Sequence, residues 1–437
     1  MEHRDLPVID NLVSLFKEKQ CCHFENIIFI CVQHLLHTTV NLMEAIIKLG
    51  AKPENIFFLG KHYSYCQTVF EHLSGIGIQC QELLPLSGYG SYYETFNNSV
   101  ASMWNNVLDH IESHCCEGIV ILDDGGRNLE FIAKNNITGL PAIVGVEQTT
   151  AGLFSPLVSQ SIIPFVDVAT SAAKINLEAH LIIEAIIEKS TKKIAHLISN
   201  SMCGIVGFGT IGRSLLSQLE SFHDNICIYD IKTPSSEYSK YSTSLEKLLF
   251  SCDLIFGCTG RDFLSTINLE DYINSNKTFV SCTSEDKEFL TLLKYLNKGR
   301  QITVANYLKD IEVQLTNNQR ICILNGGFPI NFDNSGESVT AEKIQLTRGL
   351  LLSAIIQAVK MLEPPLKEQH KQRVMLDPYL QKIVVSLWGK YGQHNIFSKQ
   401  NIQYFNNTQW IIENSGGYNI NASTFKELLE KQMLLID

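Results

Sequence analysis

The sequence predicts an α/β protein with two doubly wound parallel sheets. Apolar runs of strand length alternate with segments of helical periodicity along most of the chain, which is typical of repeated β-α-β units. Runs such as Ile27–Val32 are continuously apolar and suit strands that are buried on both faces. The chain has 437 residues, more than one core usually holds, so we expect at least two domains.

The first series of elements begins at the strand Ile27–Val32. The segment Thr38–Leu49 follows with apolar residues at helical spacing and ends at Gly50, a common helix stop. The other elements expected in this series are strands at Asn55–Leu59, Ile78–Leu83 and Gly118–Leu122, and helices at Tyr65–Leu73, Ser91–His114 and Ser171–Lys192.

A second series begins at Gly204–Val206. It continues with strands at Ile226–Tyr229, Leu254–Phe256, Thr278–Val280 and Ile302–Ala305, a long helix at Ala341–Leu362, the helix breaker Pro364–Pro365, and a helix near Thr424–Met433. We therefore expect a substrate-binding domain over residues 1–190 and a Rossmann domain over 191–332. The first domain would resume over 333–395, and a C-terminal segment would follow over 396–437.

A glycine-rich turn follows the strand Gly204–Val206 and reads Gly207–Phe208–Gly209–Thr210–Ile211–Gly212. Gly207 allows the tight turn, Gly209 lets the backbone approach a pyrophosphate, and Gly212 permits close packing of helix on strand. The helix that starts at Thr210 and Ile211 would meet the phosphates with free N–H groups. The next strand ends in Asp230, whose carboxylate suits ribose hydroxyls and repels a 2′-phosphate. The cofactor is therefore expected to be NAD.

Composition and charge narrow the classes of partner, compartment and site that the sequence allows. The net charge of −10 argues against nucleic acid and anionic membranes as partners. No apolar stretch reaches the roughly 18–20 residues of a membrane span, and the mixed-charge segment Met1–Asp5 is not a signal peptide. Thirteen cysteines without C-x-x-C spacing suggest free thiols in the cytoplasm and no metal site. Five of them lie in apolar runs and are expected to be buried: Cys31, Cys203, Cys227, Cys258 and Cys322.

The order of several motifs resembles the S-adenosylhomocysteine hydrolase family between about Asn26 and Asn331. The matching segments are Leu122–Gly126, Gly145–Gly152, Lys174 within its helix, the glycine-rich turn, Cys258–Gly260, and Asn331 after Pro329–Ile330. In that family a substrate domain precedes a central NAD domain and resumes after it. The resemblance implies an enzyme of one-carbon metabolism that acts on a nucleoside thioether.

The resemblance also implies a reaction. Tightly held NAD oxidises the ribose 3′-hydroxyl, the ketone acidifies the C4′ proton, the 5′-thiol leaves, water adds, and the ketone is reduced back. Lys174 matches the family's base for the 3′-hydroxyl, His34 a histidine near C5′, and Asp124 the second aspartate of D-D-G-G. The residues that match cofactor contacts are Thr149, Thr150, Thr259, Gly260 and Asn331.

The chain departs from the family where substrate would bind. A family threonine and glutamate become Leu36 and Thr38, and the second glutamate of E-E-T-T-T becomes Gln148. The family's two later histidines are absent, and its C-terminal lysine–tyrosine pair has no counterpart. Replacement acid–base or substrate-binding groups would be Glu178, Glu285 and Glu337. A polar shell altered in this way favours a different substrate.

Three hypotheses stay open. The first is an enzyme of this kind that keeps NAD and acts on a nucleoside-like molecule. The second is a non-catalytic relative that binds NAD and regulates a partner. The third is a dehydrogenase of another secondary alcohol that releases NADH. Association into a dimer or tetramer through the helix Ala341–Leu362 is expected by family analogy alone.

Overall fold

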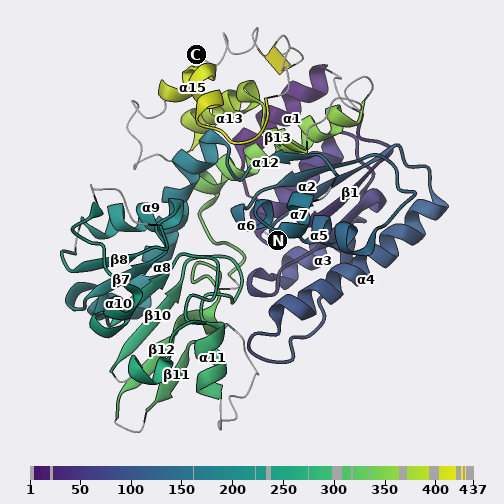
Figure 1. Cartoon of the computed structure of the whole chain (residues 1–437). Helices are drawn as coiled ribbons and strands as arrows, with labels where there is room; N and C mark the ends of the chain where they lie inside the picture. The colour runs from purple at the N-terminus through teal and green to yellow at the C-terminus, as the bar shows by residue number, and fades with distance from the viewer. Residues whose placement is uncertain are drawn as a thin grey trace. The chain divides into compact units, whose positions relative to one another are not determined.

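The computed structural model describes residues 4–19, 23–160, 162–221, 223–232, 238–273, 275–297, 308–315, 318–333, 335–363, 372–392, 403–419, 425–426 and 429. The chain divides into two compact units, each with one sheet (Figure 1). Unit 1 comprises Met1–Leu84, Phe96–Glu178 and Val339–Asp437, and unit 2 comprises Pro85–Thr95 and Ala179–Ser338.

The two units correspond to the expected substrate and Rossmann domains, but their boundaries lie at other residues. The first boundary lies after Glu178, where 190 was expected, because the helix that follows packs on a helix of unit 2. The second lies after Ser338, where 332 was expected. The segment after 396 is grouped with unit 1, and the short segment Pro85–Thr95 with unit 2.

The sheet of unit 1 has seven parallel strands in the order β13-β6-β5-β4-β1-β2-β3. The strands are β1 (Ile27–Val32), β2 (Ile56–Leu59), β3 (Gln79–Gln81), β4 (Gly118–Asp123), β5 (Ile143–Glu147), β6 (Phe165–Asp167) and β13 (Arg373–Met375). Every residue of β1 and β4 is buried, as their continuous apolar sequences predict. The predicted doubly wound fold is confirmed.

Unit 1 also contains the helices that pack on this sheet and on one another. They are α1 (Pro7–Lys19), α2 (His37–Lys48), α3 (Gln67–Gly75), most of α4 (Tyr92–Ser113), α5 (Arg127–Asn135), α6 (Thr150–Leu153), α7 (Pro156–Gln160), α12 (Ala341–Leu362), α13 (Pro378–Tyr391) and α15 (Thr408–Glu413). Short turns lie at Pro53–Asn55, His62–Ser64 and Tyr404–Asn406, and a π-helical turn lies at Lys174–Glu178.

Helix α12 is the central helix of unit 1. It packs against β4, β5 and β6 and is flanked by α1, α2 and α13, and nearly all of its residues are buried. The expectation that copies of the chain associate through this helix therefore loses its basis, because the chain's own elements already cover it. The oligomeric state itself stays a prediction.

Among the described residues, the sheet of unit 2 has six strands in the order β11-β12-β10-β9-β7-β8, of which only β11 runs antiparallel to its neighbour. The strands are β7 (Cys203–Val206), β8 (Ile226–Tyr229), β9 (Leu254–Gly257), β10 (Lys277–Ser281), β11 (Ile311–Gln314) and β12 (Arg320–Ile323). The helices are α8 (Ala179–Asn200), α9 (Thr210–Leu219), α10 (Leu245–Ser251) and α11 (Leu290–Asn297), with short turns at Leu269–Asp271 and Leu324–Gly327.

Three sequence expectations fall wholly or largely outside the described residues: the strand Ile302–Ala305, the helix breaker Pro364–Pro365, and most of the helix near Thr424–Met433. The described cysteines are free. Cys31 and Cys203 are buried as expected, but Cys227, Cys258 and Cys322 are only half-buried, which corrects that expectation. None of the described helices has the length and apolar character needed to cross a bilayer.

Candidate functional site

Each sheet has a switch point where the strand order reverses. In unit 1 the chain runs from β1 outward through β2 and β3, returns to pair β4 with the other side of β1, and continues to β5 and β6. Ligands of open α/β sheets bind at the carboxyl ends of the strands beside such a point. The residues that follow β1 and β4 therefore lie where such a sheet binds its ligand.

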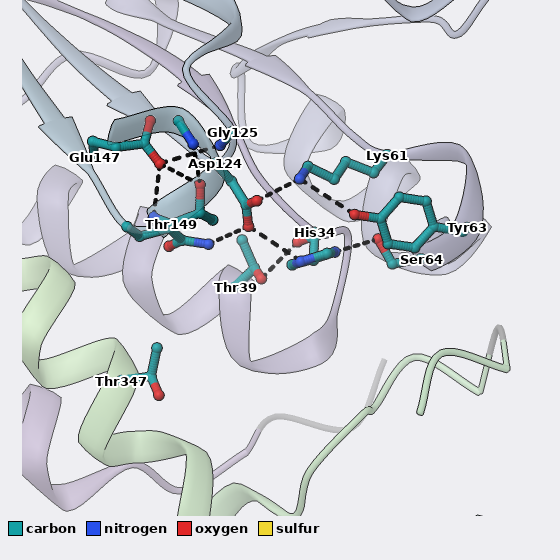
Figure 2. Close-up of polar contacts among 12 residues, drawn as sticks. His34, Thr39, Lys61, Tyr63, Ser64, Asp124, Gly125, Glu147, Thr149 and Thr347 are labelled. Carbon is teal, nitrogen blue, oxygen red and sulfur yellow. Dashed lines mark hydrogen bonds and ion pairs between the residues drawn. The ribbon is translucent and has the colours of Figure 1, made fainter. Parts of the chain in front are cut away.

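Asp124, directly after β4, is the centre of a buried polar cluster (Figure 2). Its Oδ1 accepts a hydrogen bond from the Lys61 ammonium, and its Oδ2 accepts one from the Gln148 side-chain amide. The Nε2 of His34 lies 3.2 Å from the same Oδ2. These four side chains follow β4, β2, β5 and β1, so the parallel sheet brings them together; we call them the Asp124 cluster.

The Asp124 carboxylate is ionised despite its burial. Burial alone would raise its pKa, but the adjacent Lys61 ammonium and the contact with His34 outweigh it and hold the pKa well below the usual range. The sequence departure at Gln148 also has a physical reason here, since its amide donates to Asp124. A glutamate in its place would set a second carboxylate against the first.

His34 is fixed on both ring nitrogens. Its Nδ1 lies 2.7 Å from the Ser64 hydroxyl, and its Nε2 faces Asp124. Thr39 donates to the His34 carbonyl at 2.8 Å and holds the backbone of this loop (Figure 2). Burial lowers the pKa of His34 below its ordinary value in spite of the opposing effect of Asp124, so the ring is neutral at pH 7. With Nε2–H donating to Asp124, Nδ1 accepts from Ser64.

Glu147, the last residue of β5, holds the loops that carry Asp124 and Gln148. Its carboxylate accepts from the backbone N–H groups of Gly125 at 3.2 Å, Gly126 at 2.8 Å and Thr149 at 2.7 Å, and from the Thr149 hydroxyl (Figure 2). Burial, together with the neighbouring Asp123, raises the pKa of Glu147. Its role is to position the residues beside it.

A second ion pair lies in the π-helical turn. Lys174 Nζ is 2.5 Å from Glu178 Oε2, and the Thr347 hydroxyl donates to Glu178 Oε1 at 2.6 Å. Such turns are frequent at functional sites. Thr347 projects from α12, and Figure 2 labels it below the Asp124 cluster. Two of the four predicted catalytic residues thus contact each other here, and the other two, His34 and Asp124, contact each other in the cluster.

Arg348, the neighbour of Thr347 on α12, connects the two ion pairs electrostatically. It is only 3% exposed, and it interacts with both Asp124 and Glu178. Its Nε donates to the Thr38 hydroxyl at 3.2 Å. Thr38 therefore contacts Arg348, and its expected contact with substrate stays a prediction. Leu36 is the buried residue before α2, and it contributes apolar surface to this loop.

The glycine-rich turn sits at the switch point of the second sheet, between β7 and β9. Gly207 has a φ of +96°, which favours glycine, and a Cβ on Gly212 would lie 2.1 Å from the Gly207 carbonyl oxygen. A Cβ on Gly209 would meet nothing within 4 Å. No side chain caps α9, so the N–H groups at Thr210 and Ile211 suit a pyrophosphate. The residues present fit a dinucleotide.

Asp230 and the loop after β9 complete this end of the sheet. One Asp230 oxygen accepts from the Phe208 N–H at 2.6 Å, which ties the acid to the turn. Glu288 accepts from the N–H groups of Thr259 at 2.8 Å and Gly260 at 2.6 Å. Burial raises the pKa of Glu288 to about 7. Asn331 is buried in the same unit.

The remaining predicted site residues have contacts within their own units. Glu285 and Glu337 belong to unit 2, where Glu285 pairs with Lys287 at 2.6 Å and the Glu337 carbonyl accepts from Ser335. Thr149 caps α6 by accepting from the Gly152 N–H. Thr150 is exposed at the start of that helix. Their expected contacts with substrate or NAD stay predictions.

Sequence reasoning missed Lys61, Ser64, Arg348 and Glu288. Two of them carried a usable signal. Lys61 lies two residues after the end of β2, as Asp124 lies one residue after the end of β4, and strand-end polar residues of one parallel sheet meet at one edge. Arg348 is the one charged residue between Leu346 and Val359 of α12, in a run that is otherwise uncharged and mostly apolar. A charge in such a run needs a buried partner or a ligand. Among the described residues no group of three or more His, Cys, Asp or Glu side chains could hold a metal.

Comparisons with known proteins support the cofactor. Residues 172–261 match the family "D-isomer specific 2-hydroxyacid dehydrogenase, NAD binding domain". The match runs from the π-helical turn through α9 and Asp230 to the Thr259–Gly260 loop. Two proteins from two strains of Mycobacterium tuberculosis, both named uncharacterized, are each 24% identical over 359 residues, which is 81% of this chain and 68% of theirs.

Solved structures give looser likenesses. A dipicolinate synthase from Bacillus halodurans has a TM-score of 0.37 at 10% identity, over 59% of this chain and 82% of that one. The NAD-complexed D-isomer specific 2-hydroxyacid dehydrogenase from Lactobacillus delbrueckii ssp. bulgaricus has a TM-score of 0.29 at 13% identity, over 62% and 76%.

The turn geometry, the acid at the end of β8 and the family match agree with one another. Unit 2 is a Rossmann-type NAD-binding domain, and NAD is the cofactor of this chain.

Proposed function

We propose that this chain is an NAD-dependent enzyme that oxidises a secondary hydroxyl group of a small molecule. The observation that carries the proposal is the Asp124 cluster, a buried and charged group of side chains at the switch point of the sheet in unit 1. The sheet of unit 2 has the NAD turn at its own switch point. One chain thus offers one cofactor site and one separate polar site with acid–base groups.

NAD, when bound, supplies the hydride acceptor for the carbon that carries the hydroxyl. The chain must remove the hydroxyl proton, and His34 is suited to this because its ring is neutral at pH 7. The Ser64 hydroxyl, 2.7 Å from Nδ1, can pass a proton to the ring. Asp124 at Nε2 would then stabilise the imidazolium.

Lys174 fits a different role from the one that the resemblance gave it. Its ammonium donates to Glu178 at 2.5 Å. An ammonium has three N–H donors, so the two that remain can donate to a substrate oxygen. We therefore assign it to orienting the substrate oxygen, with Glu178 and Thr347 fixing its direction.

A second candidate is the redox-neutral cycle of the adenosylhomocysteinase-like family. It is favoured by the contact of His34 with Asp124, since the resemblance gave both a place in catalysis. The contact of Lys174 with Glu178 also favours it, because the resemblance gave Lys174 a catalytic role and Glu178 was expected as a replacement acid–base group. The changes at Leu36, Thr38 and Gln148 count against adenosylhomocysteine itself as the substrate, because Thr38 and Gln148 are already bonded to Arg348 and Asp124.

The test is a substrate screen with the NAD-loaded protein in deuterated buffer. The panel contains adenosine, adenosylhomocysteine, 2-hydroxy carboxylates and phosphorylated secondary alcohols. A simple dehydrogenase accumulates NADH and ketone, whereas the redox-neutral cycle returns the hydride and leaves solvent deuterium at C4′ of a nucleoside. If no compound reduces NAD, the non-catalytic regulatory alternative replaces both proposals.

The partner proposal is a small nucleoside-like or related alcohol, with neither nucleic acid nor membrane. We also propose a homo-oligomer, dimer or tetramer, formed through a surface other than α12. Sedimentation at micromolar concentration tests this, and a monomer would contradict it.

A further inference from the structure

Arg348 is a buried cation whose hydrogen-bonding capacity is mostly unused. Its side chain is almost fully shielded by the surrounding residues, since only 3% is exposed. A guanidinium has five N–H donors, and here one of them bonds to the neutral Thr38 hydroxyl at 3.2 Å. Within the described part of the chain Arg348 makes no other hydrogen bond and no ion pair. Buried charges are otherwise paired, so a partner is missing.

The two carboxylates that interact electrostatically with Arg348 already have other partners. Asp124 bonds to Lys61, His34 and Gln148. Glu178 bonds to Lys174 and Thr347. Each of these carboxylates thus has a lysine of its own in direct contact, Lys61 for Asp124 and Lys174 for Glu178. The Arg348 guanidinium has no such contact with a described carboxylate.

Gln148 gives an independent observation at the same place. Its side-chain nitrogen donates to Asp124, but its Oε1 is buried and accepts no hydrogen bond from any described residue. The side chain is only 6% exposed. An unused acceptor suits a hydroxyl proton, as an unused guanidinium suits an anion. One small molecule with both groups would satisfy both.

We propose that the guanidinium of Arg348 binds an anionic group of the substrate, a carboxylate or a phosphate, so that the substrate is an anionic alcohol. This rests on the proposed function, because it names the substrate class of the same site. The planar guanidinium binds either anion through two parallel N–H···O bonds. Thr38 accepts one hydrogen bond from Arg348 and leaves the other N–H groups of the guanidinium available. A glutamate at position 38 would instead pair with the guanidinium.

The first readout is stability. A cation that is buried for a ligand destabilises the free protein, and replacing a buried charge with an apolar side chain of similar length is often neutral or stabilising. Arg348→Met should therefore keep or raise the melting temperature of the NAD-loaded protein. Arg373 is the matched control, since it pairs with the buried Asp167 at 2.7 Å. Arg373→Met should lower the melting temperature.

The second readout is anion binding, measured by calorimetry with lactate and, separately, inorganic phosphate. We expect at least one of the two to bind the NAD-loaded protein, and Arg348→Met to weaken that binding about tenfold or more. The preferred probe identifies a carboxylate or a phosphate. Arg348→Lys should retain part of the phosphate affinity and lose more of the carboxylate affinity, because an ammonium is a point charge.

The outcomes separate this inference from the proposed function. If neither anion binds, or if Arg348→Met binds them as wild type does, the inference is wrong. A marked loss of stability in Arg348→Met also contradicts it, since that is the result for a structural arginine. If the anion binds through Arg348 but no alcohol reduces NAD, the proposed function fails while the anion site stands. If neutral alcohols reduce NAD as fast with Arg348→Met as with wild type, the proposed function stands and the anion site is wrong.

Discussion

The Asp124 carboxylate shows how single residues determine the electrostatics of the site. It is ionised deep in unit 1 because Lys61, itself 1% exposed, is ionised beside it. Neither charge would be tolerated alone in this surrounding. The same logic makes His34 neutral, since burial outweighs the attraction of Asp124 for a proton. The charges of Lys61 and Asp124 thus stabilise each other, and removing one charge destabilises the other.

Asp124→Asn should destabilise the protein by about 3–5 kcal/mol, because it leaves the Lys61 ammonium buried without its counter-charge. Asp10→Asn is the control, since Asp10 and Lys48 form a half-exposed pair at 3.7 Å that contributes under about 1 kcal/mol. Urea unfolding measures both. Adding Lys61→Met to Asp124→Asn should recover part of the loss, and equal losses in Asp124→Asn and Asp10→Asn would refute the coupling.

Glu288 predicts a pH dependence of opposite sign to that of an ordinary surface carboxylate. Its pKa rises from 4.5 to about 7 on folding because the side chain is buried. The folded state therefore holds a proton that the unfolded state has released, and this contribution is present below pH 4.5 and lost as the pH rises through about 7. Wild type should lose on the order of 3 kcal/mol relative to Glu288→Gln across that window. Denaturant midpoints of both proteins from pH 4.5 to 8 check this, and parallel curves would contradict it.

At the scale of elements, the two switch points explain why both sites lie where they do. β1 and β4 bring His34 and Asp124 together, and β7 and β9 bring Gly207 and the Thr259 loop together. A Cβ on Gly207 would meet the Cys258 carbonyl at 2.7 Å, so the loop after β9 limits the turn after β7. Strand order, more than any single motif, selects which loops become neighbours.

Two glycines of the turn should respond differently to alanine. In Gly212→Ala the new Cβ would collide with the Gly207 carbonyl oxygen at 2.1 Å, so both stability and NAD affinity should fall. In Gly209→Ala the new Cβ meets no protein atom within 4 Å, so stability should change by less than about 0.5 kcal/mol. NAD affinity should still fall, because the pyrophosphate approaches there. Calorimetry with NAD and thermal unfolding separate the two, and unchanged NAD binding in Gly209→Ala would contradict the assignment.

The elements that the sequence predicted well are those whose pattern is local. Ile226–Tyr229 and Ala341–Leu362 match β8 and α12 in both bounds, because their apolar patterns are uninterrupted. The pair β11 and β12 was missed, although Ile311–Gln314 alternates buried and exposed residues as an edge strand does. A four-residue alternation is too short to distinguish a strand from a loop without its partner.

At the scale of the whole molecule, the cofactor site could be predicted from the sequence, and the proposed substrate site only in part. The glycine-rich turn and Asp230 lie within one β-α-β unit, so their spacing in the sequence already defines them. The Asp124 cluster draws on four loops, and Arg348 reaches Thr38 across 310 positions of the chain. Such contacts depend on which strands are neighbours, which no local pattern contains. The resemblance supplied Lys174, His34 and Asp124 but could not supply Lys61 or Arg348.

The central claim is that unit 1 presents an alcohol for oxidation by NAD, and the most direct measurement is NADH formation by the NAD-loaded protein with the best compound of the substrate screen. The comparison is Lys174→Met against Lys192→Met. Both lysines form ion pairs with a glutamate four positions away, but the Lys192–Glu188 pair is about two-thirds exposed and lies outside the site. We predict that wild type and Lys192→Met form NADH at equal rates and that Lys174→Met is at least about a hundredfold slower, with NAD still bound. NADH formed equally fast by Lys174→Met, or by none of the three proteins with any alcohol, would contradict the account.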